Sequence, residues 1–143
     1  MKHDILFYGE LRRNQNYQVL NDKLLVYVVK EEGTNICRIG CSKGIENVFT
    51  RHKAIEIANP RKLTLLGFFA VKHRSVKTYI MEYFEKTKME RSWFKLTEKD
   101  WVNIFDMDFR RNEIMKLTVA KDNYEYPSNQ LPYFYDGNWI VKK

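Results

Sequence analysis

Residues 24–40 contain the pattern that most constrains the fold of this chain. Residues 24–30 read Leu-Leu-Val-Tyr-Val-Val-Lys, a continuous apolar run rich in β-branched side chains. Such a run predicts a strand buried on both faces, in the middle of a sheet. The polar residues 31–35 include a glycine and predict a turn, and residues 36–40 predict a second strand. The two strands are therefore expected to form an antiparallel hairpin.

The remaining chain predicts helices that alternate with strands. Apolar residues recur at helical spacing after the hairpin, and Pro60 ends that pattern. Gly67 interrupts the next apolar run and indicates a β-bulge or a close approach of another segment. Thr97 and Asp100 resemble a capping box at a helix start. The expected elements are a helix over 45–58, a strand over 62–72, a helix over 75–88, a short strand or turn over 93–96, and a helix to about 117.

These elements predict one α+β (mixed α/β) domain. We expect a small three-stranded, largely antiparallel sheet flanked by about three helices, occupying residues 23–120. Residues 1–22 are expected to form an N-terminal arm with a short strand at 5–8. Residues 121–143 are rich in aromatic side chains and are expected to pack on the domain as a C-terminal extension.

The net charge of +7 over 143 residues favours a polyanionic partner. No run of about eighteen apolar residues is present, and the first ten residues do not resemble a signal peptide, so we expect no membrane partner and an intracellular location. Abundant Lys, Asn, Ile, Tyr and Phe are typical of AT-rich coding sequences, which occur in viruses, organelles and some bacteria. The two cysteines and three scattered histidines do not form a zinc pattern. We therefore expect both thiols to be structural.

Several short motifs occur in a recognisable order: Val26-Tyr27-Val28, Arg38-Ile39-Gly40, an arginine (Arg51) on the following helix, Asn59-Pro60 before an apolar strand, and Trp93-Phe94. This order resembles the GIY-YIG nuclease superfamily, in particular its divergent branch in phage, viral and bacterial proteins. The resemblance covers roughly residues 24–105. It implies a GIY-YIG-like fold and chemistry on nucleic acid.

The resemblance also implies roles for individual residues. Members of the family hydrolyse a phosphodiester with one divalent metal such as Mg²⁺, a tyrosine, an arginine and a metal-binding glutamate. Tyr27 and Arg51 match the catalytic tyrosine and arginine, although Tyr27 is equally well explained as a packed side chain of a central strand. Counting back from Trp93 places the family glutamate at Lys77. Glu82 is then the remaining candidate for a metal ligand.

The departures from the family pattern all make the charge of the site more positive. Arg38 replaces the second tyrosine, Lys77 replaces the metal-binding glutamate, and Ser92 replaces the glutamate of an E-W-F motif. These changes remove groups that would hold a metal and add positive charge. They favour a surface that binds phosphate, with the following candidate nucleic-acid-binding residues: Arg38, Lys43, Arg51, His52, Lys53, Arg61 and Lys77.

Three functions are consistent with the sequence. The first is a nucleic-acid-binding protein, with DNA favoured over RNA, on a degenerate GIY-YIG scaffold without efficient hydrolysis. The second is an active Mg²⁺-dependent endonuclease that uses Tyr27, Arg51 and Glu82. The third is a structural subunit of a viral or ribonucleoprotein assembly, which would bind a protein partner through the aromatic C-terminal segment.

Overall fold

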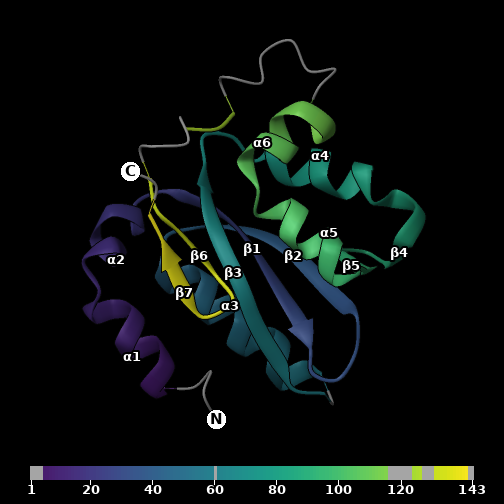
Figure 1. Ribbon diagram of the computed structural model, residues 1–143. Helices are drawn as coiled ribbons and strands as arrows, with labels where there is room; N and C mark the ends of the chain where they lie inside the picture. The colour runs from purple at the N-terminus through teal and green to yellow at the C-terminus, as the bar shows by residue number, and fades with distance from the viewer. Residues whose placement is uncertain (1–4, 60, 116–123, 127–130, 142–143) are drawn as a thin grey trace.

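The computed structural model describes residues 5–59, 61–115, 124–126 and 131–141 and shows an α+β fold. The described residues form six helices and one antiparallel sheet of seven strands, in the order β4-β5-β2-β1-β3-β6-β7 (Figure 1). The helices are α1 (Ile5–Arg13), α2 (Gln15–Leu20), α3 (Ile45–Ala58), α4 (Ser75–Tyr83), α5 (Glu98–Ile104) and α6 (Met107–Phe109). The strands are β1 (Leu24–Glu31), β2 (Ile36–Lys43), β3 (Leu63–Val71), β4 (Lys88–Glu90), β5 (Trp93–Lys95), β6 (Tyr133–Tyr135) and β7 (Asn138–Ile140).

The three strands expected from the sequence form the centre of this sheet. β1 and β2 form the predicted antiparallel hairpin, and β3 pairs with the other edge of β1. The expected burial of β1 is confirmed, because its residues 25–29 are all buried. The sheet is nevertheless larger than the three strands expected, since β5 and β4 extend it beyond β2, and the hairpin of β6 and β7 extends it beyond β3.

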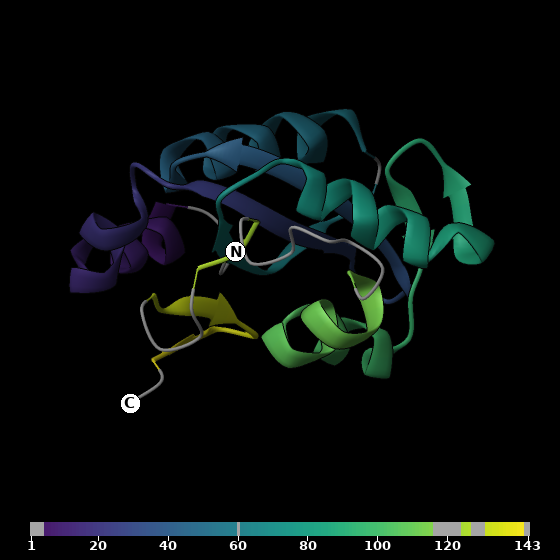
Figure 2. The ribbon, with the colours of Figure 1, turned by 90° about the horizontal axis from the view of Figure 1, so that it is seen from above.

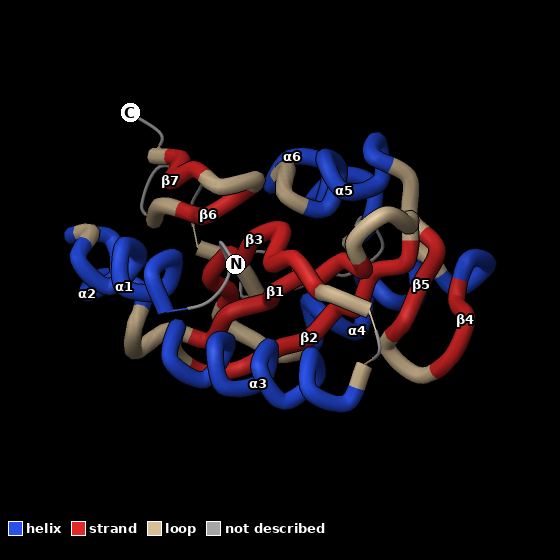
Figure 3. Tube along the Cα trace, turned by 90° about the horizontal axis from the view of Figure 1, so that it is seen from below, coloured by secondary structure: helices blue, strands red, loops and turns tan. Residues whose placement is uncertain are grey.

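Two apolar cores lie on opposite faces of the sheet. Alternate residues of β1 divide between them, with Leu25, Tyr27 and Val29 in one core and Val26 and Val28 in the other. The first core includes residues of α1, α2 and α3, and the second includes residues of α4 and α5. Figure 3 shows α3 and the pair α5–α6 on opposite sides of the central strands. Because both faces are covered, β1 must be apolar along its length.

A β-bulge in β3 changes which side chains enter each core. Val28 of β1 lies opposite Gly67, whereas the next residue, Val29, lies opposite Leu65. Leu66 is therefore the extra residue, and its carbonyl oxygen accepts a hydrogen bond from Asp136 N at 2.7 Å. Both expectations for Gly67 are confirmed, because a Cβ there would also collide with a backbone carbonyl oxygen of β6.

The N-terminal segment is helical, so the strand expected at residues 5–8 is wrong. Leu11 and Leu20 are buried against the first core, and the Arg12 guanidinium pairs with the Glu46 carboxylate of α3 at 2.6 and 2.9 Å. The Tyr17 hydroxyl donates to the same carboxylate. Figure 2 shows α1 and α2 in purple at one end of the molecule, with β4 and β5 at the other. Packing against α3 therefore decides the structure of this segment.

Two predicted helices are shorter than the sequence pattern indicates. The helix expected over 75–88 ends at Tyr83, and a 3-10 turn (Glu85–Thr87) leads into β4. The capping box of Thr97 and Asp100 is confirmed at the start of α5, but α5 ends at Ile104. Asp106 then caps a new turn, α6, through its own side chain. A π-helical turn (Arg110–Ile114) follows, and the predicted end near residue 117 lies outside the described residues. None of the helices in the described part of the chain is long and apolar enough to span a membrane.

The two cysteine thiols differ in accessibility, and this difference is testable. Cys37 is fully buried, and burial raises the pKa of its thiol from 9.0 to about 12. The unfolded chain therefore releases this proton first, and the free energy of unfolding should fall as the pH rises from 9 toward 12. At pH 8 we expect iodoacetamide to modify Cys37 only after unfolding, and to modify the half-buried Cys41 earlier, as measured by peptide mass spectrometry. Alkylation of Cys37 in the folded protein at the unfolded rate would contradict this.

Candidate functional site

Tyr27 of the first motif and Gly40, the last residue of the second, lie directly opposite each other in the hairpin. The Tyr27 side chain is 1% exposed and crosses over Gly40, where a Cβ would collide with the ring and its hydroxyl oxygen. Gly40 is thus required by the packing of Tyr27, whatever the role of the hydroxyl. Both interpretations of Tyr27 offered by the sequence remain, although burial favours packing.

Arg38 lies two residues before Gly40 and on the same face of β2. It stands opposite Trp93 of β5, and the Arg38 Cζ atom lies 6.0 Å from the centroid of the Trp93 ring. Its Nε atom is buried and has no hydrogen-bond partner in the described structure. Buried donors without an acceptor are uncommon in native proteins, so this atom of Arg38 is a feature of the site that needs an explanation.

Arg51 of α3 lies near Arg38 and Trp93. It is exposed on α3 and lines a hollow of about 310 Å³ together with Arg38 and Trp93. α3 contributes Arg51, Ala54, Ile55 and Ala58, and their i, i+3, i+4 and i+7 spacing places them on one side of the helix. The residues that line this hollow are Arg38, Arg51, Ala54, Ile55, Ala58, Asn59 and Trp93.

A second hollow, of about 350 Å³, adjoins the first because Arg51 lines both. It lies at the end of β2, and its other lining residues are Cys41, Ser42, Lys43, Asn47, Thr50 and Arg74. The Arg74 Nη1 atom donates to the Cys41 carbonyl oxygen at 3.5 Å. We call the two hollows together the Arg51 groove.

The backbone of β2 also contributes to this groove. Pairing with β5 covers only Ile36, Cys37 and Arg38, and Ile39 N donates to the Ser92 carbonyl oxygen. Alternate residues of a strand present their N–H groups to the same edge. Cys41 and Lys43 therefore direct their N–H groups to the same side as Ile39, where no further strand pairs with β2 in the described chain. Such N–H groups are suited to an anion.

The charged residues that line the Arg51 groove are all basic: Arg38, Lys43, Arg51 and Arg74. Within the described part of the chain, none of the four forms an ion pair with a carboxylate. Lys77 of α4 lies close by, because its charge and that of Arg74 oppose the rise that burial causes in the pKa of the Cys41 thiol. Lys77 does not itself line either hollow.

Four other candidates lie apart from the groove. His52 is fully buried, and its Nε2 atom lies 3.2 Å from the Leu63 carbonyl oxygen, so it cannot reach a ligand at the surface. Lys53 and Glu82 are exposed, and neither lines the groove. Arg61 is exposed, and its Nε atom lies 3.7 Å from the Glu31 carboxylate. The proposed metal ligand is therefore not placed beside Arg51.

The geometry does not suit a divalent metal such as Mg²⁺, which prefers carboxylate oxygen. The lining of the groove contains no Asp or Glu among the described residues. Nor do the described residues form any group of three or more His, Cys, Asp or Glu side chains that could hold a metal. The hollows therefore have the chemistry of an anion site.

Two of the lining residues that bear most on binding, Arg74 and Trp93, were not among the predicted site residues. Arg74 lies just before α4, which brings it to the end of β2, and no local pattern indicates this contact. In the sequence, Trp93 was noted only as part of the Trp93-Phe94 motif and was given no role in binding. Its pairing opposite Arg38 follows from the addition of β5 to the sheet.

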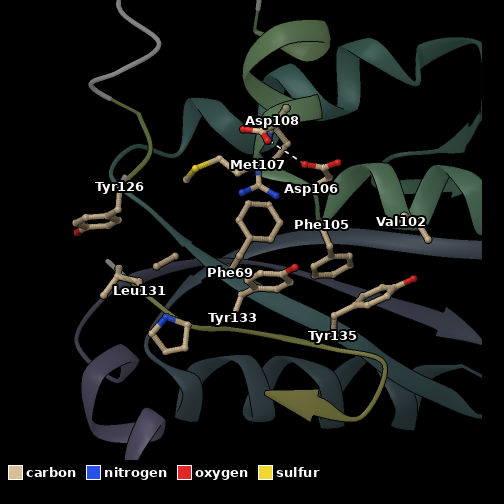
Figure 4. A pocket seen from close by; sticks show the side chains of 13 residues that line it. Phe69, Val102, Phe105, Asp106, Met107, Asp108, Tyr126, Leu131, Tyr133 and Tyr135 are labelled. Atoms are coloured by element: carbon tan, nitrogen blue, oxygen red, sulfur yellow. Dashed lines mark hydrogen bonds between the residues drawn. The ribbon is translucent and has the colours of Figure 1, made fainter. Parts of the chain in front are cut away.

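A separate hollow of about 420 Å³ has a different character. It lies between β3, α5, α6 and the segment that contains β6. Figure 4 shows the aromatic side chains of Phe69 on β3, Phe105 just after α5, and Tyr133 and Tyr135 on β6 gathered in it, with Asp106 and Asp108 above them. The dashed line marks the hydrogen bond from Asp108 N to the Asp106 carboxylate at 2.9 Å. The cation that lines this hollow is Arg110, and it is neutralised by Glu125, with Arg110 Nη2 2.7 Å from Glu125 Oε1. This hollow is therefore not suited to phosphate.

Comparisons with known proteins add no relative to this geometry. A scan against protein-family models found no match, and searches of curated proteins and of solved structures also found none. The functional argument therefore depends on the site itself.

Proposed function

We propose that this protein binds the phosphate backbone of nucleic acid in the Arg51 groove, without efficient phosphodiester hydrolysis. The observation that carries the proposal is the charge of the lining, in which Arg38, Lys43, Arg51 and Arg74 converge and none has a described carboxylate partner. Guanidinium groups bind phosphate oxygens in a bidentate manner. The resemblance to a degenerate GIY-YIG scaffold supports the same function and favours DNA over RNA.

The proposal gives each part of the groove a role. Arg51 occupies the junction of the two hollows and is the residue best placed to contact a phosphate. Arg74 and Lys43 would contact the next phosphate, near the outward N–H groups of β2. Hydrolysis by the family mechanism would require a metal-bound carboxylate near Arg51, and the exposed Glu82 does not line the groove. For this reason we favour binding over cleavage.

The test compares two basic residues on the same helix. Arg51→Ala should weaken binding to a fluorescein-labelled 20-base-pair DNA by roughly tenfold to a hundredfold, because a hydrogen bond to a charged group contributes about 1.5–3 kcal/mol. Lys53→Ala is the matched control, since Lys53 is also exposed but is rotated about 200° from Arg51 around the helix. Fluorescence anisotropy at several salt concentrations measures both.

The salt dependence provides an independent criterion. The logarithm of the binding constant should fall with the logarithm of salt concentration by about 0.9 for each phosphate contacted. Arg51→Ala should reduce this slope by about 1. Equal effects of Arg51→Ala and Lys53→Ala, or binding that is independent of salt, would contradict the proposal. Cleavage of a plasmid with Mg²⁺ that is lost in both Arg51→Ala and Glu82→Gln would instead establish the nuclease.

A further inference from the structure

The hollow beside Trp93 has features that phosphate binding alone does not explain. Its volume of about 310 Å³ is at the lower end of the range of about 300–1,000 Å³ found for small-molecule sites. One wall is the half-buried indole ring of Trp93, and another is the stretch of α3 that carries Ala54 and Ala58. Two alanines one helical turn apart leave room that larger side chains would fill.

The Arg38 guanidinium closes the hollow on the sheet side. It lies 6.0 Å from the Trp93 ring and carries a buried Nε–H with no acceptor. In native proteins, buried donors without a partner are rare, and a ligand that brings an acceptor is one explanation for such a donor. Arg51, on the other side of the same hollow, supplies a second guanidinium.

We infer that this hollow binds one unpaired nucleobase, stacked on Trp93, while Arg38 and Arg51 hold its polar edge and its phosphate. The inference rests on the proposed function and specifies its substrate class. A base inside a duplex is stacked between its neighbours and cannot enter a hollow of this kind, whereas a base in a single strand can. The preferred ligand is therefore single-stranded nucleic acid or a duplex with an extrahelical base.

The arrangement of the two hollows agrees with this assignment. Arg51 lines both, so a strand with one base beside Trp93 has its adjoining phosphates directed toward Arg51, Lys43 and Arg74. An aromatic ring next to a basic track is the arrangement by which proteins bind single strands without strong sequence preference.

The test replaces Trp93 and measures two probes, fluorescein-labelled oligothymidylate of ten nucleotides and the 20-base-pair duplex. Trp93→Leu should weaken oligothymidylate binding by about 5- to 150-fold, the contribution of stacking one base on an aromatic ring. Trp93→Phe, which retains a ring, should lose much less. Both variants should weaken binding to the duplex much less than binding to oligothymidylate, because a paired base does not use the ring.

A second variant keeps the inference testable if Trp93→Leu does not fold. Ala58→Leu fills the hollow from an exposed helix position and leaves Trp93 in place, and it should also weaken oligothymidylate selectively. Unchanged oligothymidylate binding in Ala58→Leu and in folded Trp93→Leu would overturn the inference and leave the phosphate groove standing. Equal losses for both probes would also overturn it. Failure of the wild-type protein to bind either probe would overturn the proposed function itself.

Discussion

Replacing Glu125 with Gln should reduce the free energy of unfolding by about 3–5 kcal/mol, the loss expected when one partner of a buried ion pair is removed. The Arg110 and Glu125 side chains are 4% and 0% exposed, and their closest atoms, Nη2 and Oε1, lie 2.7 Å apart. The amide of Gln has nearly the same size but carries no charge. The Arg110 guanidinium would then remain buried without a counter-ion, in contact with the Phe69 ring at 3.8 Å.

A further contact of Arg110 should keep its guanidinium buried after the substitution, so that the loss of stability is not relieved by movement of the side chain into solvent. Its Nη1 atom donates to the Ile104 carbonyl oxygen at 2.6 Å, which holds the side chain in place at the end of α5. Urea unfolding followed by circular dichroism measures the loss. Asp22→Asn is the matched control, because the Asp22 carboxylate is exposed and its pair with Lys23 should contribute little to stability.

A double variant separates the charge from the packing. Arg110→Met combined with Glu125→Leu should recover most of the stability, since apolar side chains of similar volume commonly replace a buried ion pair without loss. If Glu125→Gln unfolds at the urea concentration of the wild type, the pair does not contribute as described. If the double variant is no more stable than Glu125→Gln, packing rather than charge is responsible.

Replacing Gly67 with Ala should destabilise the fold by roughly 1–3 kcal/mol or more, because overpacking forces the neighbouring backbone to move. The added Cβ would collide with the Phe134 carbonyl oxygen of β6 and would lie 2.8 Å from a carbon of the Phe105 ring. Gly67 does not have a positive φ, so alanine meets no backbone strain there. The loss would therefore arise from the contact between β3 and β6.

The same substitution elsewhere provides the control. At Gly9 in α1, the added Cβ would meet, among the described side chains, only that of Arg13 at 3.4 Å, and Gly9→Ala should stabilise the helix by about 0.5–1 kcal/mol. Unfolding midpoints in urea give both values. Hydrogen exchange should also show that Gly67→Ala weakens protection in β6 and β7 before β1. Wild-type stability of Gly67→Ala would contradict the close pairing of β3 with β6.

Much of the central fold could be predicted because the signals are local. The continuous apolar run of β1, the turn that follows it and the 45–58 helix all depend on residues within a few positions of one another. The outer strands β4, β5, β6 and β7 have three residues each, which is too short for a periodic pattern, and of these the sequence indicated β5 alone, as a short strand or turn over 93–96. β5 and β6 are positioned by pairing with β2 and β3, and β4 and β7 by pairing with β5 and β6; the paired residues of β3 and β6 are more than sixty positions apart.

Part of the candidate site could also be predicted, because the residues concerned belong to elements with local sequence signals. Arg38, Lys43 and Arg51 were expected to lie together, and they line the Arg51 groove. His52 was also proposed, although it shares the apolar stripe of its helix, and the structure buries it. One residue corresponds to about 100° of helix rotation, so Arg51 and His52 point in different directions.

Local sequence signals and composition account for the central hairpin, the continuous apolar run of β1 and the excess of positive charge. These features follow from periodicity and composition, which do not depend on distant parts of the chain. The remaining features depend on tertiary structure, including the pairing of β6 with β3, the approach of Trp93 to Arg38 and the position of Arg74 at the end of β2. Each depends on contacts between segments that are distant in sequence, and these contacts select among alternatives that local propensity leaves equal.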